Sequence, residues 1–206
     1  AAGETVHATT SDPTSRWMIT PESTPHEIHI LVLAAGGSSR FGSPKQLVRF
    51  HGRPLLHAAV THAVEAAGNA VTVVLGANAA ELAPLLRHTP ASIAINRDWS
   101  AGLASSIRTG LARLPGTADA ALIMLADQPF VTSEDLRRLI ATARRNPDSI
   151  VAALYDGTAG VPAIFPRANF RELSELRGDQ GARALLRRHS TGILRLPMPD
   201  ASIDID

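Results

Sequence analysis

Short runs of apolar and β-branched residues recur along the chain, and they alternate with stretches whose apolar residues are three or four positions apart. Within the runs the apolar residues are mostly consecutive, which is typical of parallel strands buried on both faces. The alternation of the two patterns predicts an α/β fold with a mostly parallel sheet that becomes mixed towards its end. The predicted strands cover residues 28–33, 71–75, 92–95, 120–125, 150–154, 163–165 and 193–196.

Two of the predicted helices have recognisable ends. Pro54 stands at a first-turn position before an apolar face of 3.6-residue period, and Gly68 follows that face. Thr132 and Asp135 have the spacing of a capping box, in which each side chain accepts a hydrogen bond from the other residue's backbone N–H. We therefore expect helices that start close to Pro54 and directly after Thr132.

The first 27 residues differ in composition from the rest of the chain. They are rich in Thr, Ser, Pro, Glu and His and show little periodicity, which is typical of a disordered tail or of an extension added for expression. With 206 residues and 45% apolar content, the chain is long enough to bury a sizeable core. We expect residues 28–206 to form one domain.

Charge and residue usage exclude several classes of protein. Twenty Lys and Arg nearly balance 19 Asp and Glu, and the arginines are spread along the chain, which disfavours a nucleic-acid groove. The absence of cysteine rules out disulfides, thiolate metal sites and cysteine nucleophiles. No apolar run approaches the roughly 20 residues of a membrane span, and the N-terminus does not resemble a signal peptide. We expect a cytoplasmic protein that binds neither nucleic acid nor membranes.

The segment at 33–45 has the composition of a phosphate-binding loop. It joins an apolar strand to a stretch that contains Gly36, two further glycines, and the cations Arg40 and Lys45. Glycines let backbone N–H groups approach an anion closely, and the cations add charge that a neutral ligand would not need. The loop is neither a Walker A motif nor a dinucleotide fingerprint. We predict that it binds a nucleoside triphosphate and that its cations stabilise a departing pyrophosphate.

Carboxylates near strand ends suggest a metal site. Asp127 follows the apolar strand at 120–125 and should emerge at the carboxyl edge of the sheet, facing the glycine loop. A carboxylate there can hold Mg²⁺, which commonly takes one or two carboxylates together with substrate phosphates. Asp204 and Asp206 share one side of an extended segment, so either can complete the metal site. The alternative is that these two residues form a solvated acidic terminus.

Three further stretches have the composition of binding loops. Gly102, Ser105 and Ser106 open a predicted helix whose free N–H groups can contact a base or a phosphate, although helix capping explains the serines almost as well. The stretches at 160–162 and 178–183 are either parts of a pocket for a second substrate or structural turns. The residues alone favour neither interpretation.

Taken together, the motifs resemble a known family. Residues 33–45, 96–106 and Leu125-Ala126-Asp127-Gln128-Pro129 are similar to the MobA-like nucleotidyltransferases, in particular the CTP:molybdopterin cytidylyltransferase (molybdenum cofactor cytidylyltransferase) branch. The glycine loop combined with the second motif at this spacing is quite specific. The segments at 160–165 and 178–183 strengthen the similarity to the cytidylyltransferase branch.

This resemblance implies a three-layer Rossmann-like nucleotidyltransferase fold, with a mostly parallel sheet mixed at one edge. The implied reaction is Mg²⁺-dependent transfer of CMP from CTP to the phosphate of molybdopterin or of its molybdenum-loaded form, with release of pyrophosphate. Arg40, Lys45 and Asp127 would be catalytic, and the acceptor would bind towards Gly160, Pro162 and Asp179. The implied nucleotide-binding residues are Leu33, Ala34, Ala35, Gly36, Gly37, Ser38, Ser39, Arg40, Lys45, Gly76, Gly102, Ser105, Ser106, Ala126 and Asp127.

Three positions depart from the family pattern or narrow it. Ala35 stands where the GTP-using branch carries glycine, which favours CTP. Val161 stands where cytidylyltransferases often carry histidine. The chain stops at Asp206, whereas related sequences continue, so we expect that a closing helix is missing.

Two other functions fit the same residues. A nucleotidyltransferase that acts on a sugar phosphate or another phosphorylated alcohol would carry the same triphosphate loop. A non-catalytic nucleotide-binding accessory protein would instead deliver cofactor, with a molybdoenzyme or its maturation chaperone as partner. The joint presence of Arg40, Lys45 and Asp127 favours catalysis.

Overall fold

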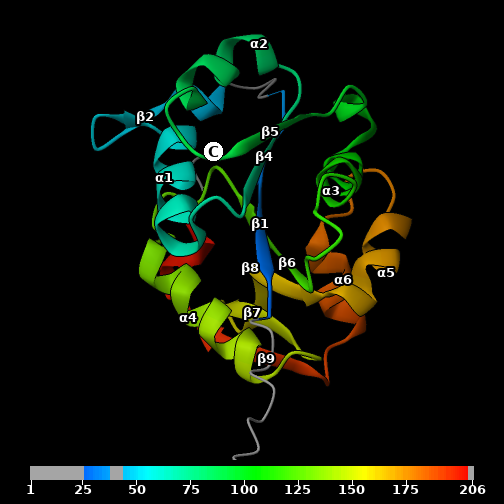
Figure 1. Cartoon of the computed structure of the whole chain (residues 1–206). Coiled ribbons are helices and arrows are strands. Elements are labelled where there is room, and N and C mark those ends of the chain that lie inside the picture. Colours follow the sequence, from blue (N-terminus) through cyan, green and yellow to red (C-terminus); the bar gives the residue numbers. More distant parts are fainter. Residues whose placement is uncertain (1–25, 38–43, 204–206) are drawn as a thin grey trace, which may run out of the picture.

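The computed structural model describes residues 26–37 and 44–203, and within them seven strands form one sheet (Figure 1). The strand order is β5-β4-β1-β6-β8-β7-β9. Only β8 runs against its neighbours, because it pairs antiparallel with β6 and β7 while the other pairs of this sheet are parallel. The strands are β1 (Ile28–Ala34), β4 (Val71–Leu75), β5 (Ser92–Ile95), β6 (Ala120–Leu125), β7 (Ile150–Tyr155), β8 (Thr158–Pro166) and β9 (Ile193–Pro197).

These bounds confirm the predicted α/β fold and its mostly parallel sheet. The mixed pairing falls in the half of the sheet that β8, β7 and β9 form. A small hairpin, β2 (Arg49–Phe50) and β3 (Arg53–Pro54), was not predicted, because two-residue strands carry no periodicity. Its turn has positive φ at both His51 (47°) and Gly52 (79°), as a tight two-residue hairpin requires.

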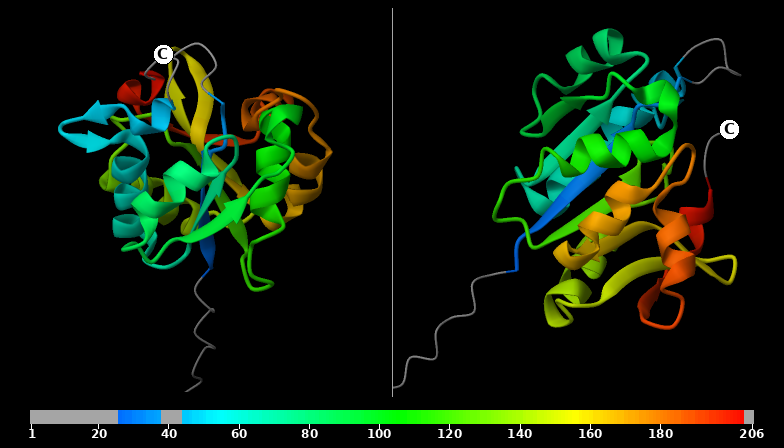
Figure 2. Two further views of the ribbon diagram at one scale, coloured as in Figure 1. Left: turned by 90° about the horizontal axis from the view of Figure 1, so that it is seen from above. Right: turned by 90° about the vertical axis from the view of Figure 1, so that its right-hand side faces the viewer.

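Helices cover both faces of the sheet, which gives three layers (Figures 1 and 2). Helices α1 and α4 pack on one face, and α3, α5 and α6 pack on the other. The α-helices are α1 (Leu55–Ala67), α2 (Ala79–Leu82), α3 (Leu103–Leu111), α4 (Ser133–Arg145), α5 (Phe170–Glu175) and α6 (Ala182–Arg188). The short 3₁₀ turns are η1 (Lys45–Leu47), η2 (Ala83–Leu86), η3 (Trp99–Ala101), η4 (Arg167–Asn169) and η5 (Pro199–Ser202).

The helix ends follow local chemistry. The capping box of α4 is confirmed, since Asp135 N donates to Thr132 Oγ1 (3.2 Å) and Thr132 N donates to Asp135 Oδ2 (3.1 Å). Gly68 ends α1 with a φ of 62°, a conformation that glycine adopts without strain. Pro54 occupies the N-cap of α1, one position before the first turn in which we placed it.

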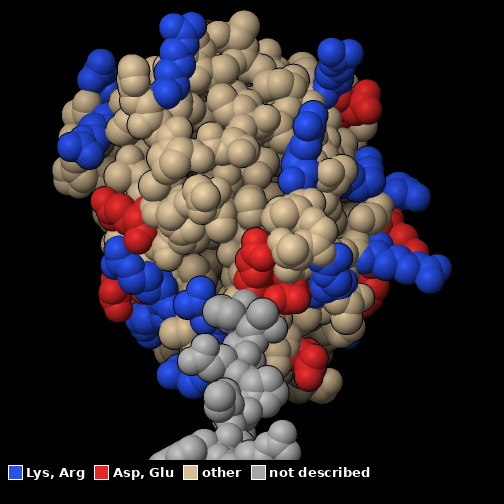
Figure 3. All heavy atoms as spheres, in the orientation of Figure 1, with Lys and Arg blue, Asp and Glu red and all other residues tan. Residues whose placement is uncertain are grey.

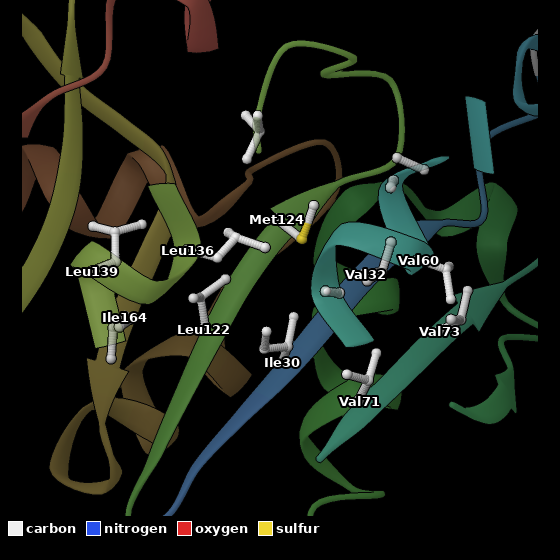
Figure 4. Packing of buried hydrophobic residues seen from close by; sticks show 14 of the residues in the cluster. Ile30, Val32, Val60, Val71, Val73, Leu122, Met124, Leu136, Leu139 and Ile164 are labelled. Carbon is white, nitrogen blue, oxygen red and sulfur yellow. The ribbon is translucent and has the colours of Figure 1, made fainter. Parts of the chain in front are cut away.

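The core lies on both faces of the sheet because successive side chains of a strand point to opposite faces. On β1, Ile30 and Val32 pack towards α1 and α4 (Figure 4), while Leu31 and Leu33 pack towards α3, α5 and α6. Figure 4 also shows Leu136 of α4 on the side of the sheet that Ile30 and Val32 occupy. Both faces are therefore closed to solvent over the central strands, whereas the edge strand β5 leaves Ile93 and Ile95 exposed.

The face of the molecule drawn in Figure 3 has no large patch of only positive or only negative side chains. Blue and red side chains are interspersed on this face around a broad uncharged area (Figure 3). This distribution agrees with the nearly balanced charge of the chain. In the part of the chain that the structure describes, no helix is both long and apolar enough to cross a bilayer.

Candidate functional site

Two cavities open at the carboxyl edge of β1 and β6. The first, here called the glycine-loop cavity, has a volume of about 540 Å³ and is lined by the end of β1, the turn after β6, η1 and the β5–α3 turn. The second, here called the arginine cavity, has a volume of about 820 Å³ and is lined by β7, β8, α6 and η5. Leu33, Leu103, Leu125 and Asp179 line both. The two cavities are therefore neighbouring compartments of one site.

Strand pairing explains where the compartments meet. Leu33 of β1 and Leu125 of β6 are register partners, and Ala126 N continues the ladder by donating to Leu33 O (3.1 Å). Because parallel strands end at the same edge, the segments after both strands face one crevice. Gly36, Gly37 and Asp127, which are far apart in the sequence, thus line the same cavity.

Most of the predicted nucleotide-binding residues that the structure describes line the glycine-loop cavity. Gly76 and Ser105 do not line it. Ser38, Ser39 and Arg40, together with Asp204 and Asp206 of the predicted metal site, lie outside the described residues. Those that line the cavity are Leu33, Ala34, Ala35, Gly36, Gly37, Lys45, Gly102, Ser106, Ala126 and Asp127.

Gln46 ties the turn that follows the glycine loop to the start of that loop, a role that was not predicted from the sequence. Its buried side chain donates through Nε2 to Ala34 O (3.1 Å) and to Gly36 O (3.1 Å). The turn that carries Lys45 is thereby tied to the end of β1. This bond pattern positions Lys45 at the cavity wall, and the Pro44-Lys45-Gln46 sequence was the available signal.

Asp127 supplies a carboxylate at the wall of the glycine-loop cavity, which Asp179 also lines. It is half-buried and lies two residues after the end of β6. Among the described residues, no cluster of three or more His, Cys, Asp or Glu could hold a metal ion by itself. A carboxylate at the wall of this cavity nevertheless fits Mg²⁺, because this ion takes most of its ligands from water and substrate phosphates.

The β5–α3 turn forms the opposite wall, and Asn96 stabilises it from inside. Asn96 Nδ2 donates to Ser105 Oγ (2.8 Å) and Ser106 Oγ (3.1 Å), and Asn96 Oδ1 accepts from Asp98 N (3.0 Å). Ser105 Oγ donates to Gly102 O (2.7 Å). Ser105 is therefore a structural residue at the start of α3, while Ser106 of the same helix also lines the cavity.

Gly102 allows the turn around Gly178 to approach α3 closely, and this contact brings the arginine cavity next to the glycine-loop cavity. Gly102 has a φ of 93°, and a Cβ there would lie 2.3 Å from the carbonyl carbon of Gly178. Ala104 N donates to Gly178 O (3.0 Å), so the turn that carries Asp179 rests directly on the start of α3. This contact places Asp179 between the two cavities.

The arginine cavity is lined by Arg183, Arg187 and Arg188 of α6. Arg183 Nη2 donates to Tyr155 Oη (3.0 Å), and the guanidinium carbon lies 5.5 Å from the centre of the tyrosine ring. Tyr155 Oη donates in turn to Val161 O (3.1 Å). The guanidinium is thus held in one orientation at the cavity wall, as an anion-binding group requires.

Of the predicted acceptor-binding residues, Asp179 lines the arginine cavity, whereas Gly160 supports a residue that lines it. Asp179 lines the cavity, and Val161, between the predicted Gly160 and Pro162, lines it as well. Gly160 instead makes room for Tyr155, because a Cβ on Gly160 would lie 2.0 Å from the tyrosine hydroxyl oxygen. Gln128 joins two walls of the arginine cavity, β8 and η5, because its Nε2 donates to Val161 O (3.0 Å) and to Ala201 O (2.7 Å).

Comparison with known proteins places this architecture in a family. The family model described as the MobA-like NTP transferase domain matches residues 30–193. The chain is 33% identical to nicotine blue oxidoreductase of Paenarthrobacter nicotinovorans over 168 residues, which cover 77% of this chain and 80% of that protein. It is 30% identical to purine catabolism protein PucB of Bacillus subtilis (strain 168) over 170 residues, or 78% of this chain and 80% of PucB.

A solved structure shares the whole architecture. Rv0371c from Mycobacterium tuberculosis H37Rv superposes with a TM-score of 0.75 at 30% identity, over 85% of this chain and 90% of that one. The same mycobacterial protein has also been solved as a complex with manganese, which superposes with a TM-score of 0.72 at 29% identity, over 84% and 89% of the two chains.

Proposed function

Because the chain belongs to the MobA-like NTP transferase family, we propose that it transfers CMP from CTP to the phosphate of molybdopterin or of its molybdenum-loaded form. In this reaction an acceptor phosphate oxygen bonds to the α-phosphorus of CTP. The bond from that phosphorus to the bridging oxygen breaks, and pyrophosphate leaves with the electron pair. The products are a dinucleotide cofactor and pyrophosphate.

The observation that carries this proposal is the pair of neighbouring cavities that share Leu33, Leu125 and Asp179. A transfer between two bound substrates requires two compartments that meet where the reacting atoms lie, and alignment supplies a large share of the rate. The glycine-loop cavity has the backbone and cation of a triphosphate site, and the arginine cavity has the charge for an anionic acceptor.

On the donor side, we assign the triphosphate to the glycine loop and to Lys45, with Arg40 as a second cation. Cations at the β- and γ-phosphates stabilise the charge that builds up on the leaving pyrophosphate. We assign Asp127 to a divalent cation, which when bound neutralises phosphate charge. The manganese complex of the mycobacterial relative supports a divalent ion in this fold, and Mg²⁺ is the ion that we propose for this chain.

No strong general base is needed. A phosphate monoester with a second pKa of about 6 is largely dianionic at pH 7 and is already a nucleophile. The protein must instead hold the acceptor phosphate close to the triphosphate of CTP although both are anions. On the acceptor side, the three arginines of α6 would offset this repulsion. Asp179, between the compartments, would orient the acceptor through a hydrogen bond rather than bind its phosphate, because two anionic groups repel each other.

The choice of CTP is supported by Ala35. Ala35 lines the glycine-loop cavity directly after β1, and we propose that its methyl group makes this cavity smaller than a glycine would. A smaller cavity favours a pyrimidine over a purine. This agrees with the glycine that stands at this position in the GTP-using branch.

One experiment separates this reaction from the two alternative functions, a sugar-phosphate nucleotidyltransferase and a non-catalytic accessory protein. Purified protein is incubated with Mg²⁺, each of the four NTPs, and either molybdopterin or a panel of sugar phosphates, and products are identified by pyrophosphate release and by mass. We expect pyrophosphate with CTP and molybdopterin, and a product heavier than molybdopterin by one CMP unit. A sugar nucleotide would identify the sugar-phosphate alternative. Nucleotide binding without pyrophosphate from any acceptor would favour the accessory protein.

A further inference from the structure

We propose that the indole of Trp99 is the surface on which the nucleobase of the donor stacks, and that it therefore determines the preference for a nucleotide over a bare polyphosphate. This inference rests on the proposed function, because it assigns the base of the donor to the glycine-loop cavity. The prediction from the motifs had assigned that contact only to the loops near Gly76 and Gly102.

The first observation is that Trp99 is a large aromatic side chain left 40% exposed at a cavity wall. Aromatic residues make up only 4% of the chain, and it contains two tryptophans. Burial of an indole contributes a large favourable free energy to folding. An indole that stays exposed at a cavity wall does not make that full contribution. A ligand that covers the exposed ring would recover that free energy.

The second observation is that glycines clear the space around this indole. A Cβ on Gly37 would lie 3.0 Å from Trp99 Cζ3, and a Cβ on Gly76 would lie 2.7 Å from Trp99 Cβ. The side chain is therefore packed against the ends of β1 and β4 at the base of the glycine loop. An aromatic surface at that position lies within the compartment to which the triphosphate is assigned.

The third observation is that the turn carrying Trp99 is rigid before any ligand binds. Gly102 N donates to Trp99 O (3.2 Å), and Ala101 N donates to Asp98 O (2.9 Å). The buried Asn96 holds the next residues through Asp98 N and the two serines of α3. A fixed ring loses little conformational entropy when a base stacks on it, so it is pre-organised for binding.

The chemistry of stacking determines which ligands Trp99 can distinguish. Every base has a π-face, so stacking is tolerant of base identity and is worth roughly 1–3 kcal/mol per base. Trp99 should therefore distinguish nucleoside triphosphates from inorganic tripolyphosphate, while the size of the cavity selects among bases. Loss of the indole should weaken CTP binding by roughly 5- to 150-fold, which is that free energy converted at about 1.4 kcal/mol per tenfold change.

The test uses the full chain with Trp17→Phe, which leaves Trp99 as the single tryptophan fluorophore. CTP and inorganic tripolyphosphate are titrated separately with Mg²⁺, and binding is followed by indole emission and by calorimetry. We expect saturable quenching by CTP. In the Trp99→Ala variant, CTP should bind roughly 5- to 150-fold more weakly while the Kd for tripolyphosphate changes less than about twofold, and Trp99→Phe should retain most of the CTP affinity.

Phe130→Ala is the matched control, because Phe130 is also 40% exposed but does not line the glycine-loop cavity. Its CTP affinity should equal that of the parent, and thermal unfolding of each variant checks the fold. Equal losses for CTP and tripolyphosphate in Trp99→Ala would show that the indole only supports the loop and would overturn the inference. CTP affinity that is unchanged in Trp99→Ala, or saturation by CTP without any change in emission, would overturn it as well. Parent protein that binds CTP but transfers no CMP would contradict the proposed function alone.

Discussion

The hydroxyl group of Tyr155 accepts a hydrogen bond from Arg183 (Nη2 to Oη, 3.0 Å) while donating its own proton to Val161 O (3.1 Å). The tyrosine is buried and lies on β7, whereas the arginine lies on α6. A residue of the sheet thereby orients a cation of the arginine cavity. Neither side chain had been singled out for this role from the sequence.

The first prediction concerns this pair. Arg183→Ala should raise the KM for the phosphorylated acceptor by roughly 10- to 150-fold, since a hydrogen bond to a charged group contributes about 1.5–3 kcal/mol. The KM for CTP should change little. Tyr155→Phe keeps the ring but removes the hydroxyl, and we expect a smaller rise in the same constant. Steady-state kinetics with each substrate varied in turn measure both, and an effect confined to the KM for CTP would contradict the assignment of the cavity.

The second prediction concerns Asp127. Asp127→Ala should abolish pyrophosphate release, because the carboxylate assigned to the divalent cation is lost. Its melting temperature should remain close to that of the parent, since a half-buried residue of a turn contributes little packing. Asp135→Ala, which removes a carboxylate outside both the glycine-loop and the arginine cavities, is a control for charge and should retain turnover. Wild-type rates in Asp127→Ala would overturn the metal assignment.

The third prediction concerns Gly160. A methyl group there would lie 2.0 Å from Tyr155 Oη, so Gly160→Ala must displace the tyrosine. We expect a loss of about 1–3 kcal/mol in the free energy of unfolding, as for other overpacked cores. Acceptor binding should weaken at the same time. Gly116→Ala is the control, because no atom lies within 4 Å of its added Cβ, and urea unfolding of the two variants should separate them clearly.

The fourth prediction concerns pH. His29 is 8% exposed, its Nε2 lies 3.0 Å from Thr72 Oγ1, and burial lowers its pKa below the ordinary 6.5, partly opposed by the charge of Glu27. The unfolded chain thus binds a proton at this position more readily than the folded protein. Stability from the neutral ring is fully present above about pH 6.5 and is lost as pH falls through that value towards the lower pKa of the folded state.

His29→Gln retains a hydrogen-bonding group but does not titrate, so it isolates this effect. Between pH 7 and pH 5, the free energy of unfolding of the parent should fall more steeply than that of the variant. Urea unfolding at several pH values provides the measurement. Parallel pH profiles would show that His29 contributes nothing to acid sensitivity.

Much of the fold follows from local pattern. The strands at 71–75, 92–95 and 120–125 were predicted with the bounds that the structure has. Consecutive apolar residues account for β4 and β6, which are buried. The predicted burial of β5 was wrong, because this strand lies at the edge of the sheet and leaves Ile93 and Ile95 exposed. The capping box at Thr132 is likewise a contact between residues three positions apart. By contrast, the hairpin at 49–54 escaped prediction because its strands are too short for any periodicity.

The candidate site divides in the same way. Glycine density and the cation Lys45 are local features, and they were enough to predict a phosphate loop beside Asp127; the structure then brings Lys45 and Asp127 to one cavity. Trp99 and Tyr155 have no such local signal. Each acquires its position from contacts with another segment, such as the approach of Gly76 to Trp99 and of Arg183 to Tyr155.

Local sequence chemistry was thus sufficient for the α/β class, the sheet-forming segments and the family motifs, since each depends on residues that are neighbours in the chain. Only the tertiary structure determines that the site has two compartments and that Leu33, Leu125 and Asp179 line both. The reason is physical: the pairing of β1 with β6 and the docking of Gly178 onto Gly102 join segments dozens of residues apart. No pattern within either segment contains that geometry.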